Sequence, residues 1–436
     1  MSRAVASRQE AVPELDLSVP IECIRCQICV KYQPNSSMTT LISFLGKGRR
    51  EKETNRYKIA NYRFDGGCAR ASYFGLALAR QLNVQKLVIL GTTGSIWDVF
   101  AEDLVDDEAA INELTAMGLD DAVATESVNQ AMLDRLAPLL RSKTGIHVIP
   151  VLIPYARDEH EQFDVLRIMA EHVTDKDHAV LDVTHGFRHL PMLALVAARY
   201  LARVRGVTVA NIFYGALEMT DSETGETPVL KLDGLLHMLD WVDALSTYDK
   251  DGDYGVFARL LDEDGFNEKQ AALLKVAAFF ERTSNPVKAR EALSSVFPVL
   301  EQHAGAAGLL FRDELTKRIS WSRKSRRSEW ELSLADAYLK RNDYVRTTMF
   351  MQEAKVSREI EERNQDVTDF STRDKWREQC QRDNDEFKRL THLRNALVHG
   401  VRSSDEKAHK SLSDEVALKK TLAGLRKNLF VANSLP

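Results

Sequence analysis

The sequence lacks the long apolar runs that a membrane-spanning protein needs. Its longest runs, such as KLVILG and LPMLALVAARYLA, fall far short of about 18 to 20 residues. The N-terminal stretch MSRAVASRQEAVPELDLSVP has no apolar core of the signal-peptide kind. The chain is also not generally basic, because its formal net charge is -5. We therefore expect a cytoplasmic protein with no membrane partner, which binds nucleic acid only at a local site.

Cysteines are few, and their odd number argues against a disulfide framework. The five are Cys23, Cys26, Cys29, Cys68 and Cys380. The first three form a C-x2-C-x2-C run, but an iron–sulfur run would need a fourth cysteine where Gln33 stands. No obvious fourth zinc ligand is near either. We expect no metal and a poorly ordered leader over residues 1–37, and the role of the three-cysteine run stays open.

The first half of the chain alternates short Val/Ile/Leu runs with amphipathic helical patterns. Strands are predicted over residues 39–46, 85–91, 145–154, 178–186 and 207–216, and helices over 70–82, 107–118, 126–142, 161–173 and 190–204. Continuous apolar strands between helices are typical of a parallel sheet that is covered on both faces. This half is therefore predicted to be a Rossmann-like α/β domain. A hairpin with a polar, glycine-containing tip is predicted over residues 216–232.

The second half shows helical periodicity only, so we expect an all-α region from about residue 235 onward. Polar loops are predicted over residues 248–255 and 318–330. The second of these, RISWSRKSRRSEW, combines many basic residues with two tryptophans. It would guide RNA by phosphate contacts and base stacking, or it is simply a solvated loop, which we favour.

Three predicted strand ends are polar or rich in glycine: FLGKG, ILGTTGSIWD and DVTHGFRH. Glycines let a ligand approach the backbone closely, and free N–H groups at helix N-termini favour anions. Neither glycine-rich turn matches G-x-G-x-x-G, and no G-x-x-x-x-G-K-[ST] is present, so an NAD site and an NTPase are not indicated. The alternative for the third segment is that Asp182 and Thr184 merely cap the following helix.

The segment LDVTHGFRHLP carries a D-x-T-H-G motif, and the three segments together resemble the CRISPR-associated Csx1/Csx2 family from about residue 39 to the end. The resemblance implies an N-terminal CARF domain, a Rossmann-like sensor of cyclic oligoadenylates that binds the ring across a homodimer axis. The implied ligand residues are Gly46, Lys47, Thr92, Thr93, Gly94, Ser95, Asp182, Thr184, His185, Gly186 and Arg188. Lys47 stands where many relatives have a small hydroxyl residue. The sequence therefore does not decide whether the ring is cyclic tetra-adenylate or cyclic hexa-adenylate.

The segment RNALVHG near the C-terminus places Asn395 and His399 four residues apart, so they share one face of a helix with Arg394 beside it. Metal-free RNA cleavage needs a proton donor near neutrality and cationic stabilisation of the phosphorane, which these residues offer. R-N-x-x-x-H is also the signature of HEPN ribonucleases, in which the Arg and His are catalytic and the polar residue assists. His392 falls outside the motif, and we interpret it as structural or peripheral.

We therefore predict an α/β plus all-α protein, with a CARF domain over residues 38–234, a helical linker region over 235–300 and a helical HEPN domain over 301–436. The expected function is a cyclic-oligoadenylate-activated, metal-independent endoribonuclease of type III CRISPR antiviral defence. It would act on single-stranded RNA, not DNA, as a homodimer or higher oligomer, and need no cofactor. The alternative is a non-catalytic sensor whose helical half is a dimerisation or partner-binding scaffold. A smaller alternative is that the CARF half also degrades its ring.

Overall fold

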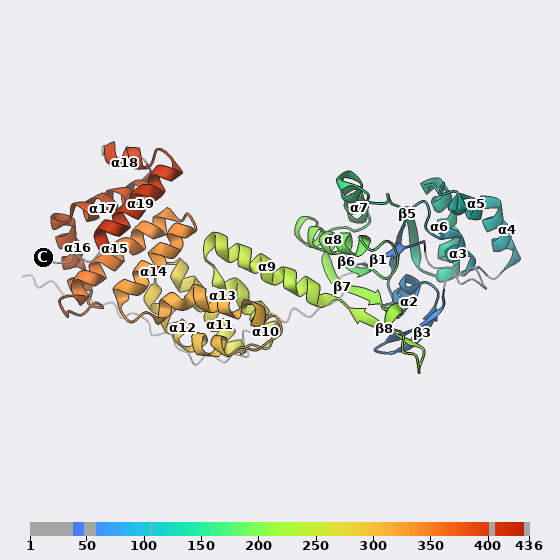
Figure 1. Ribbon diagram of the computed structural model, residues 1–436, viewed down its shortest axis with the longest axis horizontal. Helices are drawn as coiled ribbons and strands as arrows, with labels where there is room; N and C mark the ends of the chain where they lie inside the picture. The colour runs from blue at the N-terminus through green and yellow to red at the C-terminus, as the bar shows by residue number, and fades with distance from the viewer. Residues whose placement is uncertain (1–37, 48–57, 106, 401–405, 431–436) are drawn as a thin grey trace, which may run out of the picture. The chain divides into compact units, whose positions relative to one another are not determined.

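The computed structural model describes residues 38–47, 58–105, 107–400 and 406–430. The chain divides into two compact units, residues 1–233 and 234–436 (Figure 1). The predicted leader and the cysteine run within it lie outside the described residues. Every helix among the described residues is too short or too polar to reach across a lipid bilayer.

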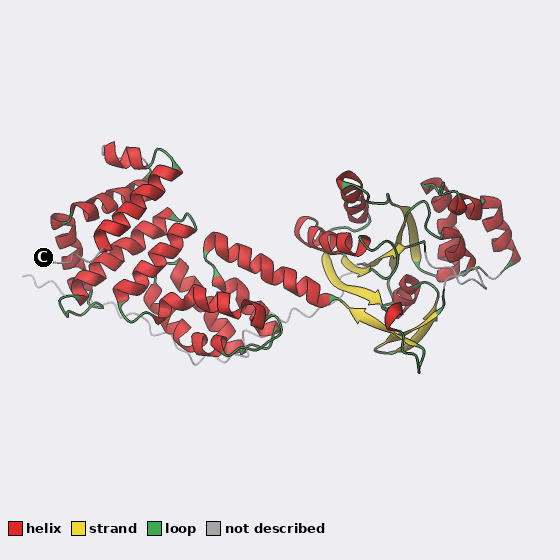
Figure 2. Ribbon diagram, in the orientation of Figure 1, coloured by secondary structure: helices red, strands yellow, loops and turns green. Residues whose placement is uncertain are grey.

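Within the described part of the chain, the N-terminal unit is built on a mixed sheet (Figure 2). Its eight strands lie in the order β3-β2-β8-β7-β6-β1-β4-β5. The strands are β1 (Thr39–Leu45), β2 (Ala60–Phe64), β3 (Gly67–Ala71), β4 (Lys86–Gly91), β5 (His147–Leu152), β6 (His178–Asp182), β7 (Thr208–Gly215) and β8 (Glu226–Lys231). The strands from β7 to β5 in this order are all parallel, which confirms the parallel sheet that the apolar runs predict.

Helices of the N-terminal unit cover both faces of this sheet. They are α2 (Phe74–Gln81), α3 (Trp97–Glu102), α4 (Glu108–Met117), α5 (Leu119–Ala124), α6 (Gln130–Thr144), α7 (Glu159–Glu171) and α8 (Leu190–Val204). Leu41 and Leu45 of β1 share one hydrophobic cluster with residues of α2, α3 and α6. Ile42 and Phe44, which alternate with them, are equally buried but lie outside that cluster. Since side chains alternate along a strand, these two face the opposite side of the sheet.

The hairpin of β2 and β3 has no counterpart in the sequence-based prediction. The prediction of a helix from residue 70 is wrong at its start, because residues 67–71 are strand and α2 begins at Phe74. β3 has the sequence GCARA and is largely exposed, so it lacks the apolar alternation by which a strand is recognised. The predicted hairpin over residues 216–232 supplies one strand, β8, which pairs antiparallel with β7.

Strand order reverses at β1, because β4 and β5 continue on one side of it and β6 and β7 on the other. Ligands of open α/β sheets bind beyond the carboxyl ends of the strands at such a switch point. The FLGK segment follows β1, the DVTHG segment follows β6, and the GTTGS segment follows β4 on the other side of β1. The topology therefore gathers all three predicted loops at the position where a ligand is expected.

The described residues of the second unit form helices, as predicted from residue 235 onward. They are α9 (Asp233–Asp251), η2 (Tyr254–Val256), α10 (Phe257–Glu263), α11 (Glu268–Arg282), α12 (Pro286–Glu301), α13 (Gly308–Ile319), η3 (Ser320–Arg323), α14 (Arg327–Lys340), α15 (Tyr344–Glu361), α16 (Phe370–Asp383), α17 (Asp385–His399), α18 (Glu406–Ser411) and α19 (Glu415–Phe430). One hydrophobic cluster extends from Trp241 to Leu429. It contains residues on both sides of residue 300, so the division into linker and HEPN domain stays a prediction.

The basic segment over residues 318–330 is not a solvated loop. It contains the end of α13, the η3 turn and the start of α14. Trp321 and Trp330 are each only 5% exposed and belong to the hydrophobic cluster. These tryptophans are therefore unable to stack on RNA bases, and the segment is chiefly a structural junction between two helices.

A buried ionic network joins α14, α15 and α16. Glu331 of α14 is 1% exposed and accepts hydrogen bonds from Arg327 at 2.8 Å and from Ser357 of α15 at 2.6 Å. Arg373 of α16 donates to Ser357 at 2.9 Å and to Glu353 of α15 at 2.5 Å. Burial raises the pKa of Glu331, although the arginines oppose this. The network therefore fixes the position of α15 between its two neighbours.

We expect Glu331→Ala to lower the free energy of unfolding by about 3 to 5 kcal/mol, because it leaves the largely buried Arg327 without its carboxylate and the buried Ser357 hydroxyl without its acceptor. Denaturant unfolding of the full chain measures this loss. The matched control is Glu378→Ala, which removes an exposed carboxylate paired with Arg382 on the surface of α16 and should change stability little. Equal effects of the two substitutions would contradict the importance of the buried network.

Candidate functional site

A buried carboxyl group links the ends of β1 and β6. Asp182 is fully buried and lies in register with Ser43 of β1, whose hydroxyl donates to it at 2.5 Å. The Tyr73 hydroxyl in turn lies 2.6 Å from the Ser43 hydroxyl, and the backbone N–H of Thr184 donates to Asp182 at 2.8 Å. Burial raises the pKa of Asp182 to about 6, against the hydrogen bonds from Ser43 and Thr184, which lower it.

The next two motif residues link β6 to the neighbouring elements. Thr184 accepts a hydrogen bond from the backbone N–H of Gly215 in β7 at 2.8 Å. His185 accepts one at Nε2 from the backbone N–H of Phe74, the first residue of α2, at 3.2 Å. Because a backbone amide can only donate, this ring is neutral with its proton on Nδ1. Burial lowers the pKa of His185 to about 4. His185 is therefore a neutral, positioned group rather than a cation.

The alternative that Asp182 and Thr184 cap the following helix is wrong. Helix α8 has His189 at its N-cap position, and no side chain caps it. The motif residues instead tie together β1, β6, β7 and α2. Gly186 has φ +105°, a conformation that other residues rarely adopt, so glycine is required at this turn.

The GTTGS loop is fixed from within. The Ser95 hydroxyl donates to the carbonyl of Leu45 at 2.6 Å and accepts from the backbone N–H of Thr92 at 2.8 Å. Both side chains are 1% exposed. A Cβ at Gly94 would lie 2.8 Å from Cε of Lys47 and 2.9 Å from the Tyr155 hydroxyl, so any larger residue would displace them. The glycine allows Lys47 to lie across this loop.

The predicted ligand residues thus separate into two groups. Those that shape the site from inside are buried: Gly46, Thr92, Gly94, Ser95 and Asp182. Those that are at least partly exposed, and so available to a ligand, are Lys47, Thr93, Thr184, His185, Gly186 and Arg188. The exposed group contributes two permanent cations, a histidine, two hydroxyls and a glycine backbone, which suits a phosphate-bearing ligand.

Sequence reasoning missed an acidic residue, Glu126, beside Lys47. Glu126 accepts hydrogen bonds from the Lys47 ammonium and from the Tyr155 hydroxyl, the latter at 2.8 Å, and Tyr155 also lies 3.2 Å from the Thr93 hydroxyl. The hydrogen bonds from Lys47 and Tyr155 hold the pKa of Glu126 below its usual range. The sequence suggests that Glu126 starts a helix, but α6 begins only at Gln130. Its backbone has φ +54°, so Glu126 belongs to a turn.

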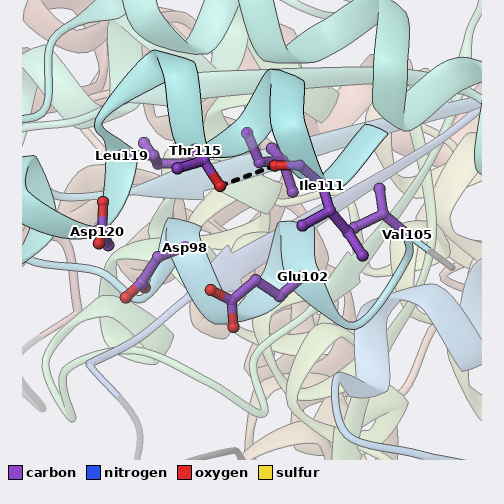
Figure 3. A pocket seen from close by; sticks show the side chains of 8 residues that line it. Asp98, Glu102, Val105, Ile111, Thr115, Leu119 and Asp120 are labelled. Carbon is purple, nitrogen blue, oxygen red and sulfur yellow. Dashed lines mark hydrogen bonds between the residues drawn. The ribbon is translucent and has the colours of Figure 1, made fainter. Parts of the chain in front are cut away.

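A separate cavity of about 230 Å³ lies between α3, α4 and α5 (Figure 3). Its polar lining includes the carboxyl groups of Asp98, Glu102 and Asp120, while Ile111 and Leu114 contribute apolar surface. Three carboxylates would repel a phosphate, so this cavity does not suit the predicted ligand. Across the described residues, no group of three or more His, Cys, Asp or Glu side chains is arranged to hold a metal ion.

The second candidate site lies at the end of α17. Arg394 is partly buried, and its Nε lies 3.3 Å from Oε1 of Gln352 on α15. Gln352 is 7% exposed and donates to the Thr391 hydroxyl at 2.7 Å, so its own orientation is fixed. Asn395 and His399 are exposed on α17, and helical spacing places them on one face. The motif alone gave no signal for Gln352, which is 42 residues away in sequence.

Residues 40–218 match the family described as CRISPR system endoribonuclease Csx1, CARF domain. This match includes all three strand-end loops. The N-terminal unit is a CARF domain of the Csx1 family. The CRISPR-associated protein MJ1674 of Methanocaldococcus jannaschii is similar, with 24% identity over 304 residues. The alignment includes 65% of this chain, and the chain spans about half the length, 47%, of that curated relative.

The CARF match confirms the family resemblance and the N-terminal fold. It ends at residue 218 and does not reach α17, so the assignment of the helical unit to the HEPN class rests on the R-N-x-x-x-H motif. The individual ligand and catalytic residues stay predictions.

Asp182 and His185 should have opposite effects on the pH dependence of CARF stability. The pKa of Asp182 is higher in the folded state than in an unfolded chain, about 6 against about 3.9, so its contribution falls as pH rises through this range. The pKa of His185 is lower when folded, about 4 against about 6.5, so its contribution rises with pH. In the wild type these slopes largely cancel.

We therefore expect Asp182→Asn to leave the His185 slope uncompensated. The free energy of unfolding of this variant should rise more steeply than that of the wild type between about pH 4 and pH 6, by about 2 to 3 kcal/mol in total. Calorimetric unfolding at several pH values measures both slopes. His185→Gln should show the reverse slope, and parallel pH profiles for all three proteins would contradict this assignment.

Proposed function

We propose that this chain is a cyclic-oligoadenylate-activated, metal-independent endoribonuclease of type III CRISPR antiviral defence, which cleaves single-stranded RNA. One observation carries the proposal: a Csx1-family CARF domain is followed, in the same chain, by a helical unit whose α17 presents Arg394, Asn395 and His399 together. A ring of adenylates presents several phosphates, and the exposed cations Lys47 and Arg188 at the strand ends suit them.

The surface of α8 supports a homodimer. Met192, Val196, Tyr200 and Val204 recur at every fourth position and are 71%, 55%, 37% and 64% exposed. A regular apolar stripe of this kind is typical of an interface. Because α8 follows directly after the D-x-T-H-G loop, a two-fold axis along this stripe would bring two copies of the loop together. The ring would then contact cations from both subunits.

In the helical unit, each residue has a definable task. The 2′-hydroxyl of the substrate loses its proton to a base and attacks the adjacent phosphorus. The pentacoordinate phosphorane is stabilised by the guanidinium of Arg394, which Gln352 orients, and by the amide of Asn395. His399 of one subunit donates a proton to the departing 5′-oxygen, and His399 of the second subunit accepts the proton from the 2′-hydroxyl. The products are a 2′,3′-cyclic phosphate and a 5′-hydroxyl end.

Ring binding activates this site only if the ring binds the active dimer more tightly than the inactive one. The ligand and the catalytic residues lie in different units of the chain. The coupling would therefore change the dimer arrangement of the helical unit, so that two sets of Arg394, Asn395 and His399 meet around one RNA strand.

The decisive experiment incubates the purified full chain with fluorescent single-stranded RNA in EDTA, with cyclic tetra-adenylate, with cyclic hexa-adenylate or without a ring. We expect cleavage with one ring only and a loss of at least about 100-fold in His399→Ala, because general acid–base catalysis is removed. His392→Ala is the matched control, since this histidine is exposed on the same helix and lies outside the motif. A chain that binds a ring but never cleaves RNA would instead be a non-catalytic sensor.

Glu126 should weaken ring binding, because a phosphate that approaches Lys47 must replace this carboxylate. We expect Glu126→Gln to bind the ring about fivefold more tightly, as removal of one nearby negative charge predicts. Isothermal titration of each variant with the ring measures the affinity. Glu102→Gln is the control, because it removes the same charge from the cavity of Figure 3. If both variants bind equally, the effect is general electrostatics rather than competition at Lys47.

A further inference from the structure

The helical unit contains an open cavity of about 430 Å³ at which three elements meet. These are the η2 turn, the C-terminal half of α11 and the start of α15. The lining residues are Asp253, Gly255, Val256, Lys275, Phe279, Arg282, Thr283 and Arg346. This volume is within the range of pockets that hold small ligands or single groups of larger ones. None of these residues belongs to the RNALVHG motif or to the CARF loops.

The cavity has an excess of positive charge. Three cations, Lys275, Arg282 and Arg346, face a single carboxylate, Asp253. Arg282 forms an ion pair with Asp253, and Arg346 lies 3.3 Å from Asp343 outside the cavity. Among the described residues, the Lys275 ammonium has neither an ionic nor a hydrogen-bond partner, and it is exposed. The cavity therefore presents a cation without a counter-charge, which an anion would complement.

An aromatic surface lies beside these cations. Phe279 is 60% exposed, although it lies on a helix whose other face is buried in the core. Its ring meets that of Phe280 edge to face, with centroids 5.4 Å apart, and the ammonium of Lys288 lies 5.2 Å from the Phe280 ring. Phe280 is partly buried against the hydrophobic cluster, so the ring that Phe279 contacts is itself fixed. The exposed ring is therefore held at the cavity as a flat apolar platform.

We propose that this cavity binds one nucleotide of the single-stranded RNA substrate, with its base on Phe279 and its phosphate at Lys275 and Arg282. An aromatic platform beside cations is how proteins hold single strands, because every base has a face that stacks and every linkage carries a charge. The carboxylates of an acidic peptide would complement the cations, but they have no ring that stacks on Phe279. The proposal rests on the proposed function, since it concerns the substrate of the same helical unit.

Helix α15 connects this cavity to the catalytic motif. Arg346 lines the cavity, and Gln352, which orients Arg394, follows six residues later on the same helix. At 1.5 Å per residue, the two positions are about 9 Å apart along the helix axis. Six residues are about one and two-thirds turns, so Arg346 and Gln352 lie on different faces of α15. A strand held at Phe279 would therefore pass around this helix to reach Arg394 and His399. The cavity would position RNA and contribute no group to the chemistry.

The test measures RNA binding without cleavage. Fluorescence anisotropy follows a labelled single-stranded RNA with the full chain carrying His399→Ala, in EDTA and without a ring. We expect Phe279→Ala to weaken binding roughly 5- to 100-fold and Phe279→Tyr to restore it, since tyrosine also stacks. Lys275→Ala should weaken binding and lower the slope of log affinity against log salt by about 1.

Lys269→Ala is the matched control, because Lys269 is an exposed lysine on the same helix, six residues before Lys275, and does not line the cavity. Unchanged RNA affinity in both Phe279→Ala and Lys275→Ala would overturn the proposal, and so would a loss as large in the control. A second measurement uses a dye-labelled nucleotide that binds the chain, with free adenosine monophosphate as its competitor. If adenosine monophosphate displaces this nucleotide completely but leaves the RNA affinity unchanged, the proposal is also overturned. Ring binding and ring-dependent cleavage are measured in separate experiments. If the ring does not activate cleavage, the RNA-binding measurement still tests this cavity.

Discussion

The N-terminal unit depends on a carboxyl group that is buried at the centre of its sheet. Asp182 stands at the end of β6, next to β1, and holds Ser43 and the backbone of Thr184 at the switch point of the strand order. A buried carboxyl is costly unless its oxygens are satisfied, and here hydrogen bonds on both oxygens offset that cost. Once this pair of strand ends is fixed, the positions of His185, Gly186 and the start of α8 follow from chain connectivity. The loops that follow β1 and β6 therefore start from strand ends whose positions are fixed.

The helical unit applies the same principle with a larger network. Glu331 of α14 binds Ser357 of α15, and Glu353 of α15 binds Arg373 of α16. Burial would raise the pKa of Glu353 if Arg377 and Arg373 did not hold it below its usual range. α15 also carries Gln352, which orients Arg394. The desolvation of buried charges offsets much of the free energy that their pairing contributes, while removal of one partner strongly destabilises the fold. The network therefore fixes the positions of side chains more than it raises net stability. The Arg394 side chain is thus positioned by residues that no active-site motif contains.

The parallel sheet, its helices and the all-helical second half could be predicted, because continuous apolar runs and helical periodicity are local properties of the sequence. The position of the three strand-end loops at one edge of the sheet could also be predicted, because their glycines and donors follow recognisable strands. β3 could not, since an exposed edge strand of small and polar residues has no apolar alternation. Glu126, Tyr155 and Gln352 were also out of reach, because their roles depend on partners 29 to 79 residues away that only the fold brings near. The burial of Trp321 likewise depends on tertiary packing.

The pairing of Lys47 with Glu126 has a consequence for background selectivity. A lysine that already has an internal carboxylate gains little from chloride, acetate or another weak monovalent anion, because one single charge merely replaces another. Under the proposed function, a ligand with several phosphates at fixed spacing would also gain contacts at Thr93, Thr184 and Arg188. The Lys47–Glu126 pair would therefore weaken the binding of abundant small anions more than that of a ligand with several phosphates. The affinity of the site would then depend on the number and arrangement of the charges of the ligand.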